Sequence, residues 1–138
     1  LILDLDHFKA INDRHGHALG DACLREFAGR LQAAFAGDEE LVARRGGEEF
    51  GVLLRDASLQ QALERAEGFR ARLAADPMDA GADAAVALSV SIGVAAFHPH
   101  RHHDADALYH AADSALYEAK AAGRNRVGTE GDVASPDR

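Results

Sequence analysis

Acidic side chains stand at two places where the sequence predicts that a strand meets a turn: Asp4, Asp6, Glu48 and Glu49. If the turn that carries the two glutamates lies beside the first strand, these carboxylates converge on one edge of a sheet. Like charges at such a separation repel one another unless a cation lies between them. Mg²⁺ takes oxygen ligands of this kind, commonly one or two carboxylates together with substrate phosphates. The pattern therefore predicts either a metal and phosphate site or an acidic, solvent-exposed hairpin.

The turn itself is predicted from residues 44–54, which read RRGGEEFGVLL. Two glycines between short apolar segments indicate a β-hairpin. Because Gly46 and Gly47 carry no side chain, a phosphate could approach the backbone N–H groups of the turn. Arg44, directly before the glycines, either steadies this site or pairs with an acid.

Hydrophobic spacing predicts the elements that must position these residues. Strands are expected at 1–5, 41–45, 50–54, 86–97 and 124–127. Helices are expected within 7–21, from Asp21, from a capping box at Ser58 and Gln61, and from Asp104 to a glycine cap at Gly123. Residues 76–84 are expected to form a loop. The order β-α-α-β-β-α-β-α-β predicts an α/β fold with a mixed central sheet flanked by helices.

Composition limits the classes of function. The chain has 138 residues, of which 47% are hydrophobic, enough for one domain with a core. Its formal charge of −8 argues against a nucleic-acid-binding surface. Cys23 is the single cysteine, so no intrachain disulfide is possible, and we expect it to be a buried small hydrophobe. No apolar run reaches the ~20 residues that cross a bilayer, so no membrane contact by this domain is expected. The chain opens inside an apolar run without an initiating Met, which predicts a piece of a longer protein.

Four segments of the sequence closely resemble the GGDEF domain of diguanylate cyclases. They read LDLDHFKAINDRHGHALGD, RRGGEEF, SVSIGVA and ADSALYEAKAAGRNRV, occur in this order, and span nearly all of residues 1–127. The signature here has the form GGEEF. The resemblance implies a catalytic domain over 1–127, similar to the palm of polymerases and to nucleotidyl cyclases, and a disordered polar tail over 128–138.

The resemblance also implies an activity and a set of site residues. Such domains condense two GTP molecules into cyclic di-GMP and release two pyrophosphates, and the work is done between two facing subunits. Asp4, the Leu5 carbonyl and Glu48 match the metal ligands, for Mg²⁺ or Mn²⁺, and Glu48 with Glu49 match the catalytic acids. The residues that match substrate contacts are Phe8, Lys9, Lys120 and Arg124 for the phosphates, Asn12 and Asp21 for guanine, and the turn glycines Gly46 and Gly47.

Several of these residues have structural alternatives. Asp21 is alternatively the N-cap of its helix, and Lys120 and Arg124 also suit the dipole of a helix C-terminus. Asp6 is either a site acid or only a solvated or capping one. The histidines of HPHRHH form either a transition-metal site or, as we favour, a solvated loop, because no carboxylate or cysteine stands at a suitable spacing: His98, His100, His102 and His103.

Two features depart from the family pattern. Many members carry an RxxD inhibitory site upstream of the signature, whereas residues 37–40 here read GDEE, so no inhibitory site is expected. The family also begins with a helix and a DxLTGLxNRR-like segment, which are missing here.

The resemblance implies a cytoplasmic homodimer controlled by an upstream sensor or regulatory domain. The main alternative is a catalytically silent GTP- or cyclic-dinucleotide-binding domain, but such domains usually lose signature acids and none is lost here. A template-directed polymerase palm is disfavoured because the chain is short and acidic.

Overall fold

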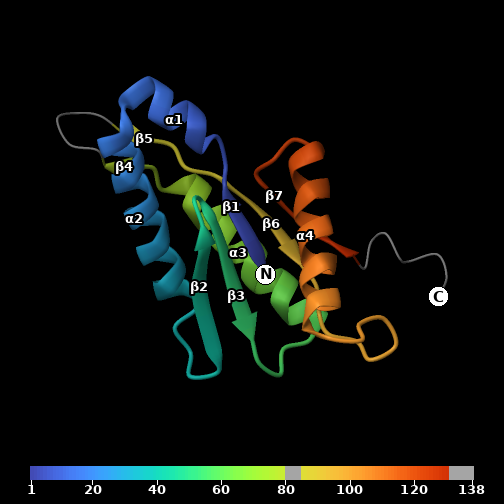
Figure 1. Ribbon diagram of the computed structural model, residues 1–138. Helices are drawn as coiled ribbons and strands as arrows, with labels where there is room; N and C mark the ends of the chain where they lie inside the picture. The colour runs from blue at the N-terminus through green and yellow to red at the C-terminus, as the bar shows by residue number, and fades with distance from the viewer. Residues whose placement is uncertain (80–84, 131–138) are drawn as a thin grey trace.

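The computed structural model describes residues 1–79 and 85–130 (Figure 1). The elements along the chain are β1 (Ile2–Leu5), α1 (Phe8–His15), α2 (His17–Ala34), β2 (Glu40–Gly46), β3 (Glu49–Leu54), α3 (Leu59–Ala75), β4 (Met78–Asp79), β5 (Ala85–Val86), β6 (Val90–Val94), α4 (Ala105–Ala121) and β7 (Arg126–Thr129). The predicted α/β fold with a mixed sheet and flanking helices is confirmed.

The central sheet has five strands in the spatial order β2-β3-β1-β6-β7. Its neighbouring strands are antiparallel except β6 and β7, which are parallel and are joined through α4. A parallel pair needs a crossover of this kind, since a tight turn can only reverse the chain. The first strand therefore lies in the middle of the sheet, with the β2–β3 hairpin on one side and β6 on the other.

The main core lies on the face of the sheet that α2 and α3 cover. Phe27 of α2 joins the layers, because its ring packs edge-on against Phe50 of β3, with centroids 5.1 Å apart, and Phe69 of α3, at 5.7 Å. Leu3 and Leu5 of β1 belong to the same cluster. Side chains alternate across a strand, so the residues between and beside these two leucines point to the other face.

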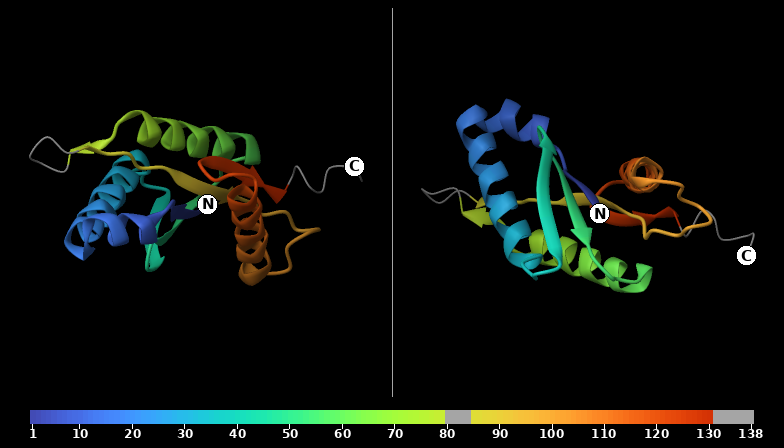
Figure 2. Two further views of the ribbon diagram at one scale, coloured as in Figure 1. Left: turned by 90° about the horizontal axis from the view of Figure 1, so that it is seen from above. Right: turned by 60° about the horizontal axis from the view of Figure 1, so that its bottom comes forward.

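Helix α4 covers that other face, opposite α3 (Figure 2). Two glycines let its backbone approach the sheet closely. A Cβ atom added at Gly93 of β6 would lie 2.0 Å from the carbonyl oxygen of Ala112, and one at Gly128 of β7 would lie 2.6 Å from that of Ala115. The glycines therefore set the distance between α4 and the strands beneath it.

The predicted helix signals are confirmed at three ends. Ser58 and Gln61 form a reciprocal capping box at the start of α3. Asp104 caps α4 by accepting a hydrogen bond from the Ala107 N–H. Gly123, with φ of 126°, follows the last residues of α4, where a residue with a Cβ atom would be strained.

Some predicted boundaries are wrong. Helix α2 begins at His17 rather than Asp21, because Gly16, with φ of 92°, is enough to separate it from α1. The strand expected over 86–97 is broken, since β5 pairs with β4 while β6 pairs with β1 and β7. Met78–Asp79 was expected to lie in a loop and is strand β4 instead; residues 80–84 of that expected loop lie outside the described residues.

The end of the domain also differs from the prediction. Arg124 and Asn125 have φ of 65° and 49°, so they form a turn, and the last strand starts only at Arg126. Gly128 and Thr129, expected in the tail, continue this strand because they pair with Gly93 and Val94. The rest of the expected tail, residues 131–138, lies outside the described residues.

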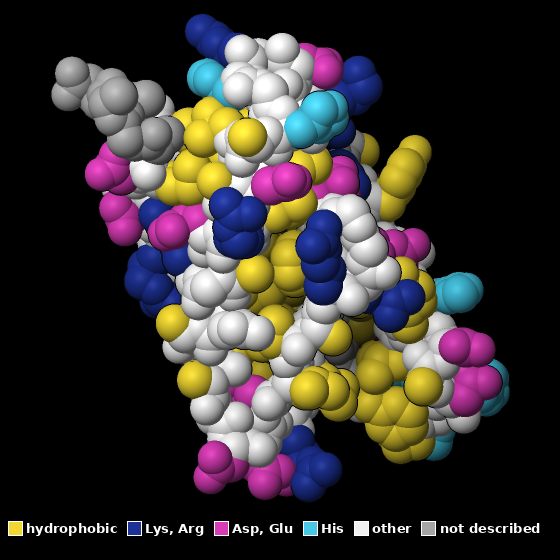
Figure 3. Space-filling model, turned by 60° about the vertical axis from the view of Figure 1, so that its left-hand side comes forward, with side chains coloured by type: hydrophobic (Ala, Val, Ile, Leu, Met, Phe, Trp, Pro, Cys, Tyr) yellow, Lys and Arg dark blue, Asp and Glu magenta, His cyan; other side chains and the backbone are white. Residues whose placement is uncertain are grey.

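Charged side chains of both signs share the surface, and hydrophobic side chains are visible between them (Figure 3). The large hydrophobic side chains that are exposed are Leu41, Leu53, Phe97 and Tyr117. Among the described helices, none combines the length and the apolar character that a bilayer crossing demands.

Candidate active site

The β2–β3 hairpin lies directly beside β1, which is the arrangement on which the predicted carboxylate cluster depends. Asp4 pairs with Glu49 across the two strands, and the Leu5 N–H donates to the Glu48 carbonyl at 3.2 Å. The ladder therefore brings the signature acids to the end of β1 and explains why two glutamates stand beside a core strand. Glu48 lies in the turn and lines the pocket described below, whereas Glu49 is the first residue of β3 and does not.

The tip of the hairpin depends on its glycines. Gly47 has φ of 52° and Gly46 has φ of 150°, and a Cβ atom added at either would meet nothing within 4 Å. The space beside the tip is thus open, while the backbone conformation of Gly47 is one that other residues rarely adopt. Arg44 donates from Nε to the Gly47 carbonyl at 2.9 Å, so of its two predicted roles the structure supports steadying the turn.

Asp4 lines the pocket and interacts with charged residues from three parts of the chain. Its carboxylate accepts a hydrogen bond from the Lys120 ammonium, which reaches β1 from the last turn of α4. Burial raises the pKa of the Asp4 carboxyl, Lys120 opposes this, and the charges of Glu48 and Asp6 raise it further. A second cation at this point would relieve the remaining repulsion between the carboxylates.

One open pocket of about 390 Å³ brings together most of the predicted site residues: Asp4, Leu5, Phe8, Lys9, Glu48, Lys120 and Arg124. Its lining is completed by Asp6, His7, Ala10 and Asp13. Acids and cations therefore share its lining. Lys9 extends into solvent, where its only described partner is Asp13, also exposed, at 3.3 Å. Its ammonium is therefore available to an anionic ligand at little cost.

The N-terminus of α1 opens onto the same pocket. His7 precedes the helix in a left-handed conformation with φ of 58°, and no side chain caps the first turn. Phe8 begins the helix, so the backbone N–H groups that follow lack an intrahelical acceptor. Such a helix start attracts phosphate groups through these donors and through the helix dipole.

Asp6 lines the pocket, and its carboxylate also has a structural role that the sequence did not predict. Its carboxylate is buried and accepts hydrogen bonds from the hydroxyls of Ser89 and Ser91, at 2.8 and 2.7 Å, and from the Asn125 N–H at 3.0 Å. It is therefore neither solvated nor a helix cap. Through Asn125 it fixes the turn after α4 that carries Arg124.

Asn12 and Asp21 lie outside the lining of this pocket. Asn12 is on α1, and its Oδ1 atom is buried without a hydrogen-bond partner in the described structure. The absence of a side chain at Gly20 makes room for it, since a Cβ atom there would lie 1.7 Å from this oxygen. Asp21 is exposed in the first half of α2, so the predicted N-cap role is wrong.

The histidine loop is anchored rather than fully solvated. His102 is buried, its Nε2 lies 2.9 Å from Glu130, and its Nδ1 accepts from the His98 N–H. The expected absence of a carboxylate partner is wrong, because Glu130 comes from the far end of the chain. Over residues 1–79 and 85–130, no three or more His, Cys, Asp and Glu side chains are grouped to hold a metal by themselves. Cys23 is a buried free thiol, as expected.

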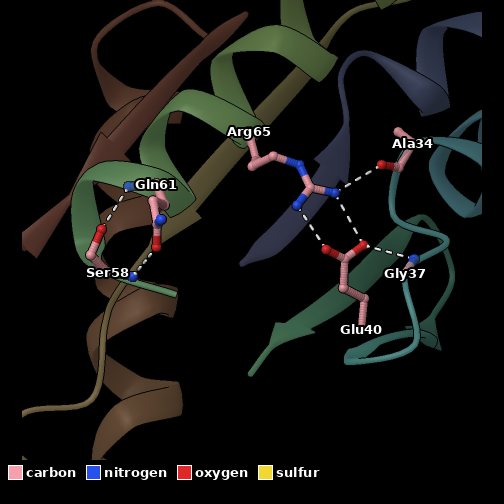
Figure 4. Close-up of polar contacts among 6 residues, drawn as sticks. All are labelled: Ala34, Gly37, Glu40, Ser58, Gln61 and Arg65. Atoms are coloured by element: carbon pink, nitrogen blue, oxygen red, sulfur yellow. Dashed lines mark hydrogen bonds and ion pairs between the residues drawn. The ribbon is translucent and has the colours of Figure 1, made fainter. Parts of the chain in front are cut away.

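The segment 37–40, upstream of the hairpin, is tied into an ion pair (Figure 4). Arg65 of α3 binds both carboxylate oxygens of Glu40, at 2.7 and 3.0 Å, and donates to the Ala34 carbonyl. Glu40 also accepts from the Gly37 N–H at 3.1 Å, and Arg65 lowers the pKa of the Glu40 carboxyl. The opposite charges of Arg65 and Glu40 therefore neutralise one another within this segment.

Sequence reasoning missed several residues around the site. Ser91 is buried and Ser89 is half-buried, and both alternate with apolar residues, a spacing that places the two hydroxyls on the face opposite the apolar side chains. Arg45 and Tyr109, which contact one another across the sheet and α4, left no such signal.

Comparison with known proteins identifies relatives of the whole described region. The profile of the family described as "Diguanylate cyclase, GGDEF domain" matches residues 1–126. The chain is 43% identical over 130 residues to diguanylate cyclase DosC of Escherichia coli (strain K12), an alignment that covers 92% of the chain and 27% of DosC. The chain thus spans about a quarter of the length of that curated relative.

Solved structures of GGDEF and GGEEF domains have the same fold as this chain. The active GGEEF domain of a diguanylate cyclase from Vibrio cholerae superposes with a TM-score of 0.81 at 36% identity, covering 92% of this chain and 78% of that one. The coiled coil and GGDEF domain of DgcB from Caulobacter crescentus, in complex with c-di-GMP, gives a TM-score of 0.82 at 29% identity, covering 92% and 66%.

Proposed function

We propose that this chain, which belongs to the GGDEF domain family, is a diguanylate cyclase domain that condenses two GTP molecules into cyclic di-GMP and two pyrophosphates. One observation carries the proposal: the acids Asp4 and Glu48 and the cations Lys9, Lys120 and Arg124 line a single pocket. Acids alone would repel a triphosphate, and cations alone would bind it without activating it. The combination is what nucleotidyl transfer requires.

The cations and the start of α1 bind the β- and γ-phosphates in this proposal. Arg124 is presented by a turn that Asp6 holds, and Lys9 is exposed, with only a solvent-exposed ion pair to Asp13 to give up. Lys120 changes partner when GTP binds, moving from Asp4 to a phosphate oxygen. The Phe8 end of α1 contributes backbone N–H donors, and the open sides of Gly46 and Gly47 let a phosphate approach the hairpin tip.

The GGDEF family uses divalent metal ions, and the donors present fit one. The Asp4 and Glu48 carboxylates and the Leu5 carbonyl would hold Mg²⁺ or Mn²⁺, which takes oxygen ligands and completes its shell with phosphates. When bound, the ion offsets phosphate charge and favours attack of a 3′-hydroxyl on the α-phosphorus of the other GTP. Glu48 and Glu49 are the proposed catalytic acids, and Glu49 acts from outside the pocket lining.

Asn12 and Asp21 are the proposed guanine contacts. Asp21 is exposed on α2 and has no capping role to perform, which leaves its carboxylate available. A carboxylate accepts from both the N1–H and the exocyclic amine of guanine, a pattern that adenine does not offer. The Asn12 amide can donate to guanine O6 or N3.

The chain offers one half of the reaction, so we propose that two copies face one another, each with one GTP. In the full-length protein we expect an upstream sensor or regulatory domain to control this pairing, and a cytoplasmic location for the domain. We also propose that product does not inhibit through residues 37–40, because Glu40 is already bound by Arg65. Calorimetry with cyclic di-GMP tests this, and tight binding that Glu40→Ala abolishes would contradict it.

The deciding experiment is incubation of the full-length protein with GTP and Mg²⁺, followed by chromatographic separation of the nucleotides. We expect cyclic di-GMP from the wild type and none from a well-folded Glu48→Ala variant, while Glu64→Ala, which removes an exposed acid from α3, retains activity. GTP binding without turnover by the wild type would favour the silent binding domain. Normal turnover by Glu48→Ala would remove Glu48 from the mechanism.

A further inference from the structure

The two adjacent arginines of the hairpin leave it in different directions. Arg44 donates to the Gly47 carbonyl and lies over the ring of Phe50, with its guanidinium carbon 6.0 Å from the centroid. The strand pairing then jumps from Arg44 with Phe50 to Gly46 with Glu49, so Arg45 is the extra residue of a β-bulge. A bulge re-aims a side chain, and here it aims Arg45 at the face that α4 covers.

Arg45 contacts both that helix and a signature acid. Its guanidinium carbon lies 4.2 Å from the centroid of the Tyr109 ring of α4, well within cation–π range. Its Nε lies 3.6 Å from a carboxylate oxygen of Glu49. Its aliphatic stem crosses Gly51, where an added Cβ atom would stand 3.7 Å from Arg45 Cδ. Tyr109, Arg45 and Glu49 therefore form a chain of contacts from α4 to β3.

Helix α4 thus reaches both acid-bearing strands. Near its C-terminal end Lys120 binds Asp4 of β1, and near its N-terminal end Tyr109 holds Glu49 of β3 through Arg45. Glu48 lines the pocket and Glu49 does not, so the two neighbouring acids have different surroundings. Fixing Glu49 fixes the strand end from which Glu48 projects.

We propose that Arg45 and Tyr109 are positioning residues, which clamp Glu49 to α4 and so hold Glu48 opposite Asp4 during the reaction. This inference rests on the proposed diguanylate cyclase activity. Neither residue lines the phosphate pocket, so the clamp governs the geometry of the reacting groups rather than the binding of GTP. Loss of the clamp should therefore lower kcat and leave KM for GTP nearly unchanged.

The test is a double-mutant cycle in the full-length protein with Arg45→Met, which keeps the aliphatic stem, and Tyr109→Leu, which removes the ring. We expect each single change to lower kcat about fivefold, and the double change to lower it little further, because the two residues act as one unit. Tyr109→Phe keeps the ring and should restore most of the rate. Tyr117→Leu, an exposed tyrosine on the same helix, is the matched control.

A second readout separates this inference from the proposed function. Amide hydrogen exchange at residues 46–50 reports how firmly the hairpin tip is held, whether or not the protein makes cyclic di-GMP. We expect faster exchange there in Tyr109→Leu and Arg45→Met than in Tyr117→Leu. If wild-type protein makes no product, the proposed function fails and exchange still decides the clamp. Additive effects on kcat, or exchange equal to that of Tyr117→Leu, would overturn it.

Discussion

Replacing Gly93 with Ala tests the closest contact between the sheet and α4. The added Cβ atom would lie 2.0 Å from the Ala112 carbonyl oxygen, 2.4 Å from the Leu116 nitrogen and 2.9 Å from the Leu116 Cα. All three are backbone atoms of a helix, so no side chain can rotate away. Relief requires α4 to move off β6 by an amount on the order of 1 Å.

The expected cost follows from overpacking. Inserting a carbon into a well-packed interior typically destabilises a protein by about 1–3 kcal/mol. Alanine also restricts the unfolded chain and returns about 0.4–1 kcal/mol. We therefore expect Gly93→Ala to lower the free energy of unfolding by about 1–2 kcal/mol. Lys120 and Tyr109 belong to α4, so a shift of this helix would move both side chains. Cyclic di-GMP synthesis should therefore fall as well, even at temperatures where the variant stays folded.

Urea denaturation followed by circular dichroism measures this change. The matched control is Gly29→Ala in α2, where an added Cβ atom meets nothing within 4 Å. That substitution should stabilise the protein by up to about 1 kcal/mol, since alanine is the better helix former. Gly93→Ala that is as stable as the wild type would refute the argument that these glycines set the position of α4.

Three further predictions concern the site and its surroundings. Asp21→Ser should weaken guanine selection and admit some ATP, as product analysis with mixed nucleotides will reveal; strict GTP specificity at an unchanged rate would contradict the base contact. Arg65 lowers the pKa of Glu40, so their pair stabilises the fold above the unfolded pKa near 4.5 and is lost as the pH falls through the lower folded pKa. Glu40→Gln should therefore cost up to about 1 kcal/mol in urea denaturation at pH 7 and progressively less as the pH falls below about 4.5. Finally, the rate per molecule should rise with protein concentration, since two half-sites must meet; a rate independent of concentration in a monomer by light scattering would exclude the two-subunit mechanism.

Local signals explain what could be predicted from the sequence. The alternation of β1 and the glycine pair of the hairpin are short-range patterns, so the strand and the turn could be predicted. The pairing of the two, which brings Asp4 beside the signature acids, is seen only in the structure. Helix caps at Ser58 and Asp104 depend on residues three positions apart, so they too are visible in the sequence. The start of α2 was placed too late because Gly16 alone separates it from α1, a break that hydrophobic spacing does not record.

Long-range partners explain what could not be predicted. Asp6 is saturated by Ser89, Ser91 and Asn125, which follow it by 83, 85 and 119 positions. His102 is bound by Glu130, 28 positions later. No periodicity or motif links such pairs, because their contact is created by the sheet order and by the crossover through α4. From the sequence alone, an acid such as Asp6 or a histidine such as His102 is therefore predicted to be solvated, although the fold buries both.

The different fates of Asp4 and Asp6 follow from the same geometry. Asp4 lies in β1 on the face that α4 covers, and its described side-chain partner is one flexible ammonium, that of Lys120, which a ligand can draw away. Asp6 lies just past the strand and is held by the hydroxyls of Ser89, directly before β6, and Ser91, within it, and by a backbone N–H of the turn after α4. Releasing Asp6 would leave a buried charge unpaired, which costs far more than exchanging one partner for another. In the proposed reaction Asp4 can therefore change partners as GTP binds, whereas Asp6 stays in place and keeps the turn that carries Arg124 at the proposed phosphate site.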